Sequence, residues 1–539
     1  MLFIFAFIIA LVVTMLLIPP VMKWADKIGA IDVPDARKVH TQAIPRVGGI
    51  AMVAGSVISI LLLAELDQQV IAILAGFLVI WGFGLWDDKC DLNYKVKFLG
   101  QLLAVVIVVT WGDVIVRTFP FIDGHIPDYL AIPLTIFALV GITNAINLSD
   151  GLDGLAGGTS LITISIIALL AYDANGEMVL IISMAVAGSV LGFLRHNTYP
   201  ARLFMGDTGS QFLGFSLGVL VIVLSQSVNS AMSPLIPLFI LGLPILDTMA
   251  VMGQRIYERR SPFSPDKNHI HHKLLDIGFD QYESVFIIYL LQTTLVAVAY
   301  FMLYESDTVL VLIYIVISGF VLGFFHYARL TSWKFHAKEL SETSLIRSIV
   351  HSLREKGWLT TVPTMILKVL VPLVLLSSTI FVTDVQQDMA VLAGLLLVVL
   401  VIVLLIDSNG TGLIEKAIAY IVSVMAVYML STSSELDNSY IVNWVFALLV
   451  IAFALRVRFS HEKTFQVTPL DYLVIILVVI VPNLPEVHLE ESGIGGMAIK
   501  LVVLFYACES VMHQKTRSWD LMRWGTLGAL SVIVFRGVL

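Results

Sequence analysis

Long apolar runs, separated by short polar segments, dominate the chain up to residue 330. About eleven of these runs are long enough to cross a bilayer as a helix. We expect them near residues 2–20, 48–65, 70–86, 98–116, 129–146, 158–172, 177–194, 208–225, 234–254, 284–303 and 308–328. The pattern predicts an all-α, polytopic membrane helical bundle, with about 11 transmembrane helices in this part of the chain.

The last third of the chain resumes this pattern after a more polar interval. About 5 to 7 further membrane helices are predicted near residues 363–382, 388–406, 415–430, 439–455, 468–482, 496–512 and 521–537. In the interval, Leu345, Ile349 and Leu353 recur at helical spacing, so we expect an amphipathic helix on the membrane surface. We therefore predict a membrane domain at 1–330, a cytoplasmic interfacial linker at 331–362 and a C-terminal membrane domain of unknown role at 363–539.

The composition agrees with a membrane protein. Of the 539 residues, 58% are hydrophobic and 13% are charged, and the mean hydropathy is +0.92. Cys90 and Cys508 are the only cysteines, too few for a disulfide framework or a thiolate metal cluster. The first apolar run lacks a basic leading segment and a small-residue cleavage site, so we interpret it as a retained span.

The positive charges lie in alternate connections between the predicted spans. One set of connections contains Lys23, Lys27, Arg37, Lys38, Arg46, Lys89, Lys95, Lys97, Arg195, Arg202, Arg255, Arg259, Arg260, Lys267 and Lys273. The opposite set contains only Arg117. By the positive-inside rule, the basic set is cytoplasmic and the N-terminus is outside.

The segment 143–158 ends an apolar run with two Asn, two Asp and several Gly. Polar residues at a bilayer boundary are costly unless they have a role. Asn144 and Asn147 are three residues apart and therefore share a helical face. Asp150 and Asp153 flank glycines that allow a close backbone approach. A simple helix cap with a glycine turn is the alternative.

Two further segments bring carboxylates to predicted helix ends. Asp87 and Asp88 end one run and Lys97 lies near the start of the next, so a carboxylate there can accept a proton or help to hold a divalent cation. Solvated loop residues are the alternative. Asp207 lies where another helix begins, a position that suits a metal ligand beside an anion. An N-cap is its alternative, and both roles are compatible.

Two basic segments complete the predicted cytoplasmic set. The loop 32–49 contains Lys38 and Arg46 with paired glycines, which indicates either phosphate contact or a topological anchor. The loop 253–283 contains three closely spaced histidines, for which contact with an anion or substrate is favoured over zinc and over a merely exposed cluster: His269, His271 and His272. Asp247 lies within an apolar run, and we expect it to be paired or near the polar residues.

These residue types together suit a substrate with several phosphates. Mg²⁺ binds through a few carboxylates while bridging phosphate oxygens, and it neutralises the charge that develops in phosphoryl transfer. A site at a membrane boundary favours a second substrate that is itself a lipid phosphate. A transporter for an anionic substrate and a silent assembly scaffold are the alternatives, although the charges gather at one boundary and no half-repeat is visible.

Four motifs occur in order: DDKCDLNYKVKF, NAINLSDGLDGL, GDTGS and HIHHKL, preceded by RKVH and PRVGG. Together they resemble the polyprenyl-phosphate N-acetylhexosamine-1-phosphate transferase family over about residues 1–330. The resemblance implies transfer of a sugar 1-phosphate from a UDP-amino sugar to undecaprenyl phosphate with Mg²⁺, or alternatively Mn²⁺, and release of UMP. HIHHKL is similar to the branch that uses UDP-N-acetylglucosamine. The product would initiate a cell-envelope glycan, such as lipopolysaccharide or teichoic acid.

The resemblance also implies roles for individual residues. It makes Asp207 the leading magnesium ligand and Asn147 a second contact. Further catalytic positions are implied for Asp87, Asp88, Asp150, Asp153, His269, His271 and His272, and substrate contacts for Lys38, Arg46, Lys97, Asn144 and Asn147. The multi-pass protein would lie in the cell inner membrane with its site on the cytoplasmic face, without a nucleic-acid partner, and a homodimer is compatible with the resemblance. Chains of this family typically end soon after the eleventh span, so the C-terminal extension departs from the usual family architecture.

Overall fold

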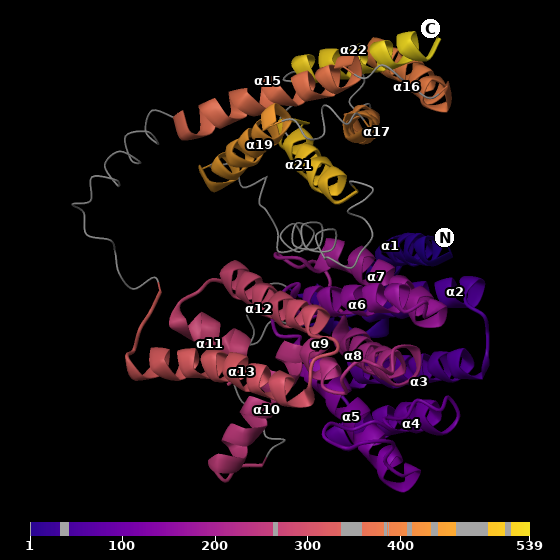
Figure 1. The fold of residues 1–539 in the computed structure, drawn as a ribbon, viewed down its shortest axis with the longest axis vertical. Helices are drawn as coiled ribbons and strands as arrows, with labels where there is room; N and C mark the ends of the chain where they lie inside the picture. Colours follow the sequence, from indigo (N-terminus) through magenta and orange to yellow (C-terminus); the bar gives the residue numbers. More distant parts are fainter. Residues whose placement is uncertain are drawn as a thin grey trace. The chain divides into compact units, whose positions relative to one another are not determined.

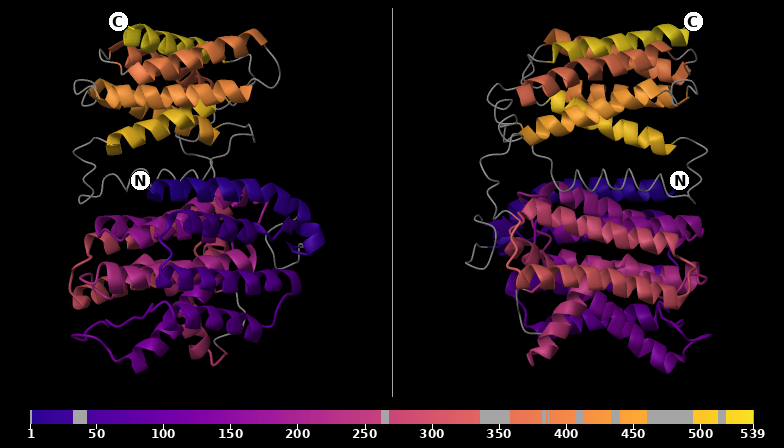
Figure 2. Two further views of the ribbon diagram at one scale, coloured as in Figure 1. Left: turned by 90° about the vertical axis from the view of Figure 1, so that its right-hand side faces the viewer. Right: turned by 60° about the vertical axis from the view of Figure 1, so that its left-hand side comes forward.

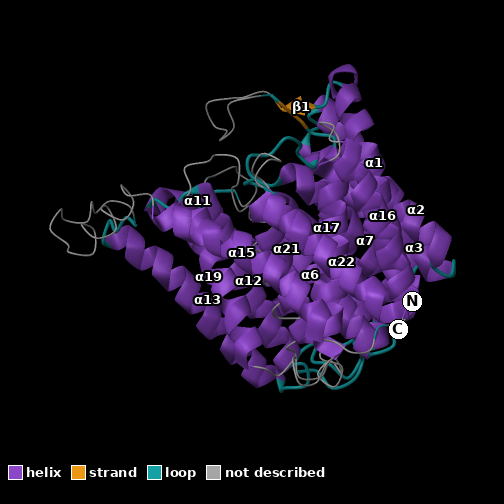
Figure 3. Cartoon of the chain, turned by 90° about the horizontal axis from the view of Figure 1, so that it is seen from above, coloured by secondary structure: helices purple, strands orange, loops and turns teal. Residues whose placement is uncertain are grey.

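The structure is a computed structural model that describes residues 2–32, 43–261, 268–335, 358–381, 385, 387–406, 412–432, 440–459, 494–512 and 519–538. The described residues are mostly helical, with two short strands and connecting loops (Figure 3). Nine of their helices are long and apolar enough to cross a membrane. These observations confirm the all-α, polytopic membrane class. The described residues divide into two compact units, one within 2–335 and the other within 358–538.

The first unit is a bundle of helices with one small antiparallel sheet. Its helices are α1 (Leu2–Ile28), α2 (Gly48–Leu63), α3 (Gln68–Cys90), α4 (Tyr94–Thr110), α5 (Asp128–Ser149), α6 (Leu155–Asp173), α7 (Glu177–Asn197), α8 (Gly206–Val223), the π-helix η1 (Leu224–Val228), α9 (Ile236–Ile240), α10 (Gly242–Tyr257), α11 (Ile270–Ile277), α12 (Gln281–Phe301) and α13 (Asp307–Leu330). Strands β1 (Ile31–Asp32) and β2 (Ile44–Pro45) pair with Ile31 opposite Pro45. Most of these helices lie side by side with nearly parallel axes, whereas α10 slants away from them (Figure 1; Figure 2).

Helix α8 occupies the centre of this unit. It contacts α2, α3, α5, α6 and α7. Every residue from Thr208 to Val223 is buried. A helix that is apolar on all sides is stable only when other elements cover it completely. The burial of α8 therefore fixes its first turn, which contains Asp207, against the ends of the surrounding helices.

The predicted span 234–254 is interrupted in the structure. Helix α9 ends at Ile240 and α10 begins at Gly242. The buried side chain of Gln292 satisfies the backbone at the break, because its amide donates to the Ile240 carbonyl (2.9 Å) and accepts from the Leu243 N–H (3.0 Å). Irregular backbone at membrane depth is tolerated when protein groups replace the missing hydrogen bonds. The apolar pattern alone did not indicate this break.

Three further predictions about element boundaries were wrong. Helix α1 continues through Pro19 and Pro20 to Ile28, because Val21 and Ala25 extend its buried face. Helix α4 ends at Thr110 rather than near 116, and Asp113 adopts a positive φ soon afterwards. The predicted loop 253–283 contains the end of α10, the short α11 and the start of α12.

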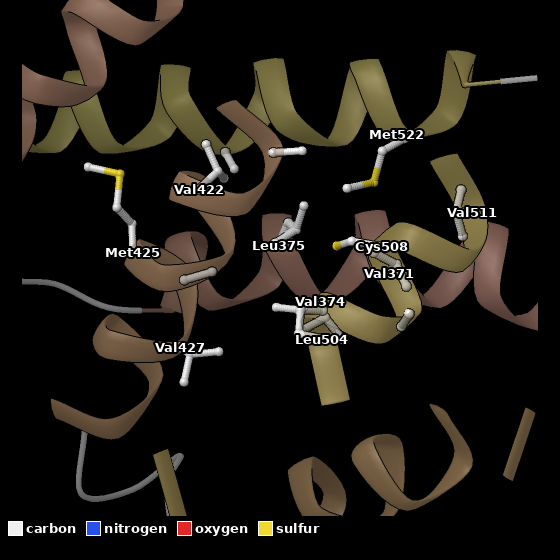
Figure 4. Packing of buried hydrophobic residues seen from close by; sticks show 14 of the residues in the cluster. Val371, Val374, Leu375, Val422, Met425, Val427, Leu504, Cys508, Val511 and Met522 are labelled. Atoms are coloured by element: carbon white, nitrogen blue, oxygen red, sulfur yellow. The ribbon is translucent and has the colours of Figure 1, made fainter. Parts of the chain in front are cut away.

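The second unit has its own apolar core. Its helices are α15 (Trp358–Phe381), α16 (Gln387–Ile406), α17 (Gly412–Thr432), α19 (Tyr440–Phe459), α21 (Ile494–Met512) and α22 (Asp520–Val538). Leu375, Val422, Leu504 and Cys508 pack together at its centre (Figure 4). These contacts join α15, α17 and α21 into one structure.

Charged side chains also bind the helices of the second unit together. Arg523 on α22 donates two hydrogen bonds to Glu415 on α17, at 2.7 and 3.0 Å. Lys416 forms an ion pair of 2.9 Å with Glu509 on α21. Ionisable groups within a membrane are costly unless they are paired, so these pairs specify which helix ends meet. The predicted amphipathic helix near 345–353 and the predicted span 468–482 lie outside the described residues.

Candidate active site

A cluster of polar side chains forms where four helices of the first unit meet. Asp87 lies near the end of α3, Lys97 near the start of α4, Asn147 near the end of α5 and Asp207 in the first turn of α8. Lys97 Nζ lies 2.6 Å from Asp87 Oδ2 and 3.4 Å from Asp207 Oδ2. Asn147 Nδ2 donates to Asp207 Oδ1 at 2.8 Å. The structure therefore brings the predicted metal ligands and Lys97 into direct contact.

Helix geometry explains why these residues meet. Helices α3 and α5 end at the cluster, whereas α4 and α8 begin there. The unpaired N–H groups at a helix N-terminus favour negative charge, so α4 and α8 both suit the carboxylates of Asp87 and Asp207. The cluster therefore combines two carboxylates, one ammonium and two helix N-termini.

Asp88 has a different environment from its neighbour Asp87. Its Oδ1 accepts from the Asp207 N–H at 2.7 Å, and its Oδ2 accepts from the Thr208 N–H at 3.1 Å and from the Thr208 hydroxyl. Gly206 has a φ of 69°, and a Cβ there would lie 2.5 Å from the Asp88 carboxylate. Asp88 thus caps α8 from a neighbouring helix, and Gly206 makes room for it.

A layer of amide side chains lies next to the carboxylates. Asn144 Nδ2 donates to Gln101 Oε1 at 2.7 Å, and Gln101 Nε2 donates to Gln211 Oε1 at 3.2 Å. The sequence analysis missed Gln101 and Gln211. Each lies four residues after a predicted site residue, Lys97 or Asp207, and therefore on the same helical face. That spacing was the available signal.

The turn between α5 and α6 contains the other two predicted aspartates. Asp150 remains accessible to solvent, but the surrounding protein removes part of its hydration and raises its pKa to about 7. The charges of Asp207 and Asp153 raise this pKa further, and Arg46 opposes them. Asp153 instead accepts a hydrogen bond from the Ala201 N–H at 2.9 Å, so it ties this turn to the segment that precedes α8.

The three histidines lie at the beginning of α11, where the sequence analysis expected a loop. The rings of His269 and His271 are stacked with centroids 5.8 Å apart, and the ring of His272 lies 4.2 Å from that of His271. His271 packs on the turn after α5, since a Cβ on Gly151 would lie 2.3 Å from its Nε2. Burial, reinforced by the charge of His272, lowers the pKa of His271 to about 3, so its ring is neutral near pH 7.

The basic loop packs beside the same segment before α8. Arg46 forms an ion pair with Asp32 across the two-stranded sheet. The Pro45 carbonyl accepts from the Phe204 N–H at 2.8 Å, which holds the loop close to the start of α8. Lys38 lies outside the described residues.

The donor set fits Mg²⁺. No group of three His, Cys, Asp or Glu within the described residues is arranged to hold a metal ion. Mg²⁺ does not need such a cage, because it binds through one or two carboxylates plus substrate phosphates and water. Asp87 Oδ2 is buried and, apart from the ion pair with Lys97, accepts no hydrogen bond. This oxygen and the Asp207 carboxylate are hard oxygen donors in one cluster, whereas Asn147 directs its amide nitrogen at Asp207 and would have to turn to offer its oxygen to a cation.

A helical membrane bundle with carboxylate, amide and lysine groups gathered at its helix ends has the groups that an integral membrane enzyme of phosphoryl transfer needs. The sequence model of Glycosyl transferase family 4 matches residues 70–225. The chain belongs to the polyprenyl-phosphate N-acetylhexosamine-1-phosphate transferase family. The matched residues contain Asp87, Asp88, Asn147 and Asp207, whereas Arg46 and the histidines lie outside them.

Curated relatives agree with this assignment. A "probable undecaprenyl-phosphate N-acetylglucosaminyl 1-phosphate transferase" of Bacillus subtilis is 43% identical over 289 residues, which are 53% of this chain and 81% of the relative. A decaprenyl-phosphate N-acetylglucosaminephosphotransferase of Mycobacterium tuberculosis is 36% identical over 52% of this chain and 78% of the relative. An undecaprenyl-phosphate alpha-N-acetylglucosaminyl 1-phosphate transferase of Escherichia coli K12 is 29% identical over 57% and 84%. These matches do not favour the transporter or scaffold alternatives.

Proposed function

We propose that this protein transfers N-acetylglucosamine 1-phosphate from UDP-N-acetylglucosamine to undecaprenyl phosphate, releasing UMP. The names of the curated relatives support a polyprenyl phosphate acceptor and an N-acetylglucosamine 1-phosphate donor. The product, an undecaprenyl-diphosphate sugar, would begin a cell-envelope glycan. One observation carries the proposal: Asp87, Lys97, Asn147 and Asp207 from four helices share one set of direct contacts.

The reaction is a displacement at the sugar-linked phosphorus. An oxygen of the lipid phosphate forms a bond to this phosphorus, and the bridging oxygen leaves with UMP. In the proposed site, Asp207 and the Asn147 amide would hold Mg²⁺, which would stabilise negative charge on the phosphate oxygens when bound. A covalent aspartyl intermediate is the rival scheme.

The residues of the chain have separate roles in this proposal. Asp87 is the candidate base that takes a proton from the lipid phosphate, because its buried Oδ2 faces the cluster. Lys97, which contacts both Asp87 and Asp207, offsets part of their negative charge before the substrates bind and would then contact phosphate. Asp88 holds Asp207 through the α8 backbone and acts as a positioning residue.

Exposed apolar side chains beside the cluster support a lipid acceptor. Leu148 follows Asn147 directly and is 42% exposed, and Met249 on α10 is 63% exposed. Helices α5 and α10 contact each other. A polyprenyl chain in the bilayer can therefore lie against both helices while its phosphate reaches the carboxylate cluster.

We place the site on the cytoplasmic face of the cell inner membrane. The positive-inside pattern supports this orientation, because the connections around Lys97, Arg46 and Lys273 are the basic ones. A peptide tag inserted at residues 65–69 should then be labelled on intact cells. Labelling only after permeabilisation would reverse the orientation.

The decisive experiment presents the purified full-length protein with a panel of UDP-amino sugars and undecaprenyl phosphate, with and without Mg²⁺ or Mn²⁺. Released UMP is measured. We expect UMP only when UDP-N-acetylglucosamine, the lipid phosphate and a divalent cation are all present. Turnover of a different UDP-sugar would change the donor assignment, and turnover in a metal chelator would remove the cation from the proposal.

A further inference from the structure

Asp247 and His269 form a buried pair outside the carboxylate cluster. Asp247 lies on α10 and is 7% exposed, and His269 directly precedes α11 and is 6% exposed. His269 Nδ1 lies 2.8 Å from Asp247 Oδ2. The other carboxylate oxygen accepts from the Ile270 N–H, also at 2.8 Å. One carboxylate therefore holds both the histidine ring and the first N–H of α11.

The chemistry of this pair determines where the imidazole proton lies. An ionised carboxylate has only acceptors, so Nδ1 of His269 must be the donor. In the neutral ring, Nε2 is then the unprotonated nitrogen. A carboxylate partner of this kind fixes both the tautomer and the orientation of a histidine. Asn in place of Asp247 could still accept from Ile270, but its amide would present a donor to Nδ1 and favour the opposite tautomer.

The pair is connected to the turn that contains Asp150. The ring of His269 stacks on His271 with an interplanar angle of 7°. His271 in turn packs over Gly151, where there is no room for a Cβ. A cavity of about 20 Å³, enough for about one water, is lined by residues that include Ser149, Asp247 and His271. A change at Asp247 is therefore transmitted through packed groups to the end of α5.

We propose that Asp247 is a positioning residue for the sugar-nucleotide donor, because it fixes the tautomer of His269 and the start of α11. This inference rests on the proposed function, in which the histidine segment 269–272 contacts the donor. It assigns a role to Asp247, a buried carboxylate that lies outside the polar cluster of Asp87 and Asp207. Among the described residues, Asp247 on α10 and His271 on α11 face His269, and His272 packs on the far partner, His271.

The test compares Asp247→Asn with Asp276→Asn in the full-length protein. Asp276 is an exposed residue on the same α11, so its replacement removes one negative charge without altering the pair. We expect Asp247→Asn to lower kcat/KM for UDP-N-acetylglucosamine by about tenfold to hundredfold, the range for an outer partner of a functional histidine. The KM for undecaprenyl phosphate should change less than about twofold, and Asp276→Asn should match the wild type.

A second pair of variants keeps the inference testable if Asp247→Asn does not fold. His269→Asn retains an N–H hydrogen-bond donor near the Nδ1 position. His269→Gln instead retains an amide group near the Nε2 position. If Nε2 of His269 contacts the sugar nucleotide, His269→Asn should weaken binding of UDP-N-acetylglucosamine, although its hydrogen bond to Asp247 survives. Wild-type kinetics in His269→Asn would show that the pair has only a structural role and would overturn the inference.

A spectroscopic measurement separates this inference from the proposed function. The ¹⁵N shifts of labelled histidines distinguish a protonated from an unprotonated ring nitrogen, and His269→Gln identifies the His269 signals. We expect a protonated Nδ1 in the wild type and a protonated Nε2 in Asp247→Asn. An unchanged tautomer would overturn the inference even in an active enzyme. A protein with the expected tautomers that neither binds a UDP-sugar nor releases UMP would instead overturn the proposed function.

Discussion

Replacement of Asp88 by Asn tests whether the adjacent aspartates have different roles. Asp88 accepts hydrogen bonds from the Asp207 N–H (2.7 Å), the Thr208 N–H (3.1 Å) and the Thr208 hydroxyl. It is 9% exposed, so water cannot replace these bonds easily. The Asn amide nitrogen would face a donor, and at least one N–H of α8 would lose its acceptor.

The expected loss of stability follows from these contacts. Loss of a helix cap costs about 0.5–2 kcal/mol, and a hydrogen bond to a charged group contributes about 1.5–3 kcal/mol. We therefore expect Asp88→Asn to lower the free energy of unfolding by about 2–3 kcal/mol. Asp207 lies in the first turn of α8, which Asp88 caps, so loss of the cap should displace the Asp207 carboxylate. A displacement of about 1 Å at a reacting group can cost about a hundredfold in rate.

The assay measures the thermal midpoint and UMP release for three variants of the full-length protein. Asp88→Asn should lose several degrees in Tm and most of its activity together. Asp87→Asn should lose activity at nearly unchanged Tm, because the amide oxygen can still accept from the Leu92 N–H that Asp87 Oδ1 binds at 2.8 Å. Asp91→Asn is the matched control, since Asp91 is exposed and its left-handed backbone suits Asn.

Two results would refute this reasoning. If Asp88→Asn kept the wild-type Tm and lost all UMP release, Asp88 would act on the substrates directly and not through α8. Equal losses of stability in Asp87→Asn and Asp88→Asn would show that both aspartates are structural. Either result would remove the division of roles.

Four further predictions concern other parts of the chain. Asp207→Asn should abolish transfer while the protein stays folded, and near-normal turnover would remove Asp207 from the metal site. The pKa of His271 is lowered to about 3, so the free energy of unfolding should fall as the pH drops below about 6.5, by at most about 1.4 kcal/mol per pH unit for this group. His271→Gln should make the Tm less dependent on pH between pH 7 and 5. A chain cut near residue 336 should retain some UMP release, and complete loss in a folded product would contradict this. Glu415→Gln should lower stability by up to about 3 kcal/mol, because it removes the carboxylate that accepts two hydrogen bonds from Arg523 and leaves the more distant Asp520 at 3.8 Å; an unchanged Tm would show that the Glu415–Arg523 pair is dispensable.

The sequence was sufficient to predict most of the helices and several of the residues that the structure brings into one polar cluster. Apolar runs gave the spans because helix length must match bilayer thickness. Asp87, Asn147 and Asp207 were evident because polar groups at the ends of such runs are costly. Their mutual contact was a prediction from function and could not be derived from local pattern, since it depends on how α3, α5 and α8 pack.

Features that depend on a distant partner were not predictable. The break at Leu241 is stable because Gln292, 49 and 52 residues from its two backbone partners, satisfies them. Gln101 and Gln211 are ordinary polar residues until Asn144 lies beside them. Asp88 caps a helix that begins more than a hundred residues later, at a sequence separation of 119. In each case the pattern shows the residue type, and only tertiary packing supplies its partner.

The charges of the cluster explain why a divalent cation and a phosphate substrate suit it together. Lys97 offers one positive charge to the two carboxylates of Asp87 and Asp207, so the three side chains retain a negative balance. This balance favours a cation, and the N-termini of α4 and α8 then favour the phosphate oxygens that accompany it. If Lys97 moves from the carboxylates to phosphate on binding, Lys97→Met should impair donor binding more than it impairs folding. A variant that binds the UDP-sugar normally would show that Lys97 only neutralises the empty site.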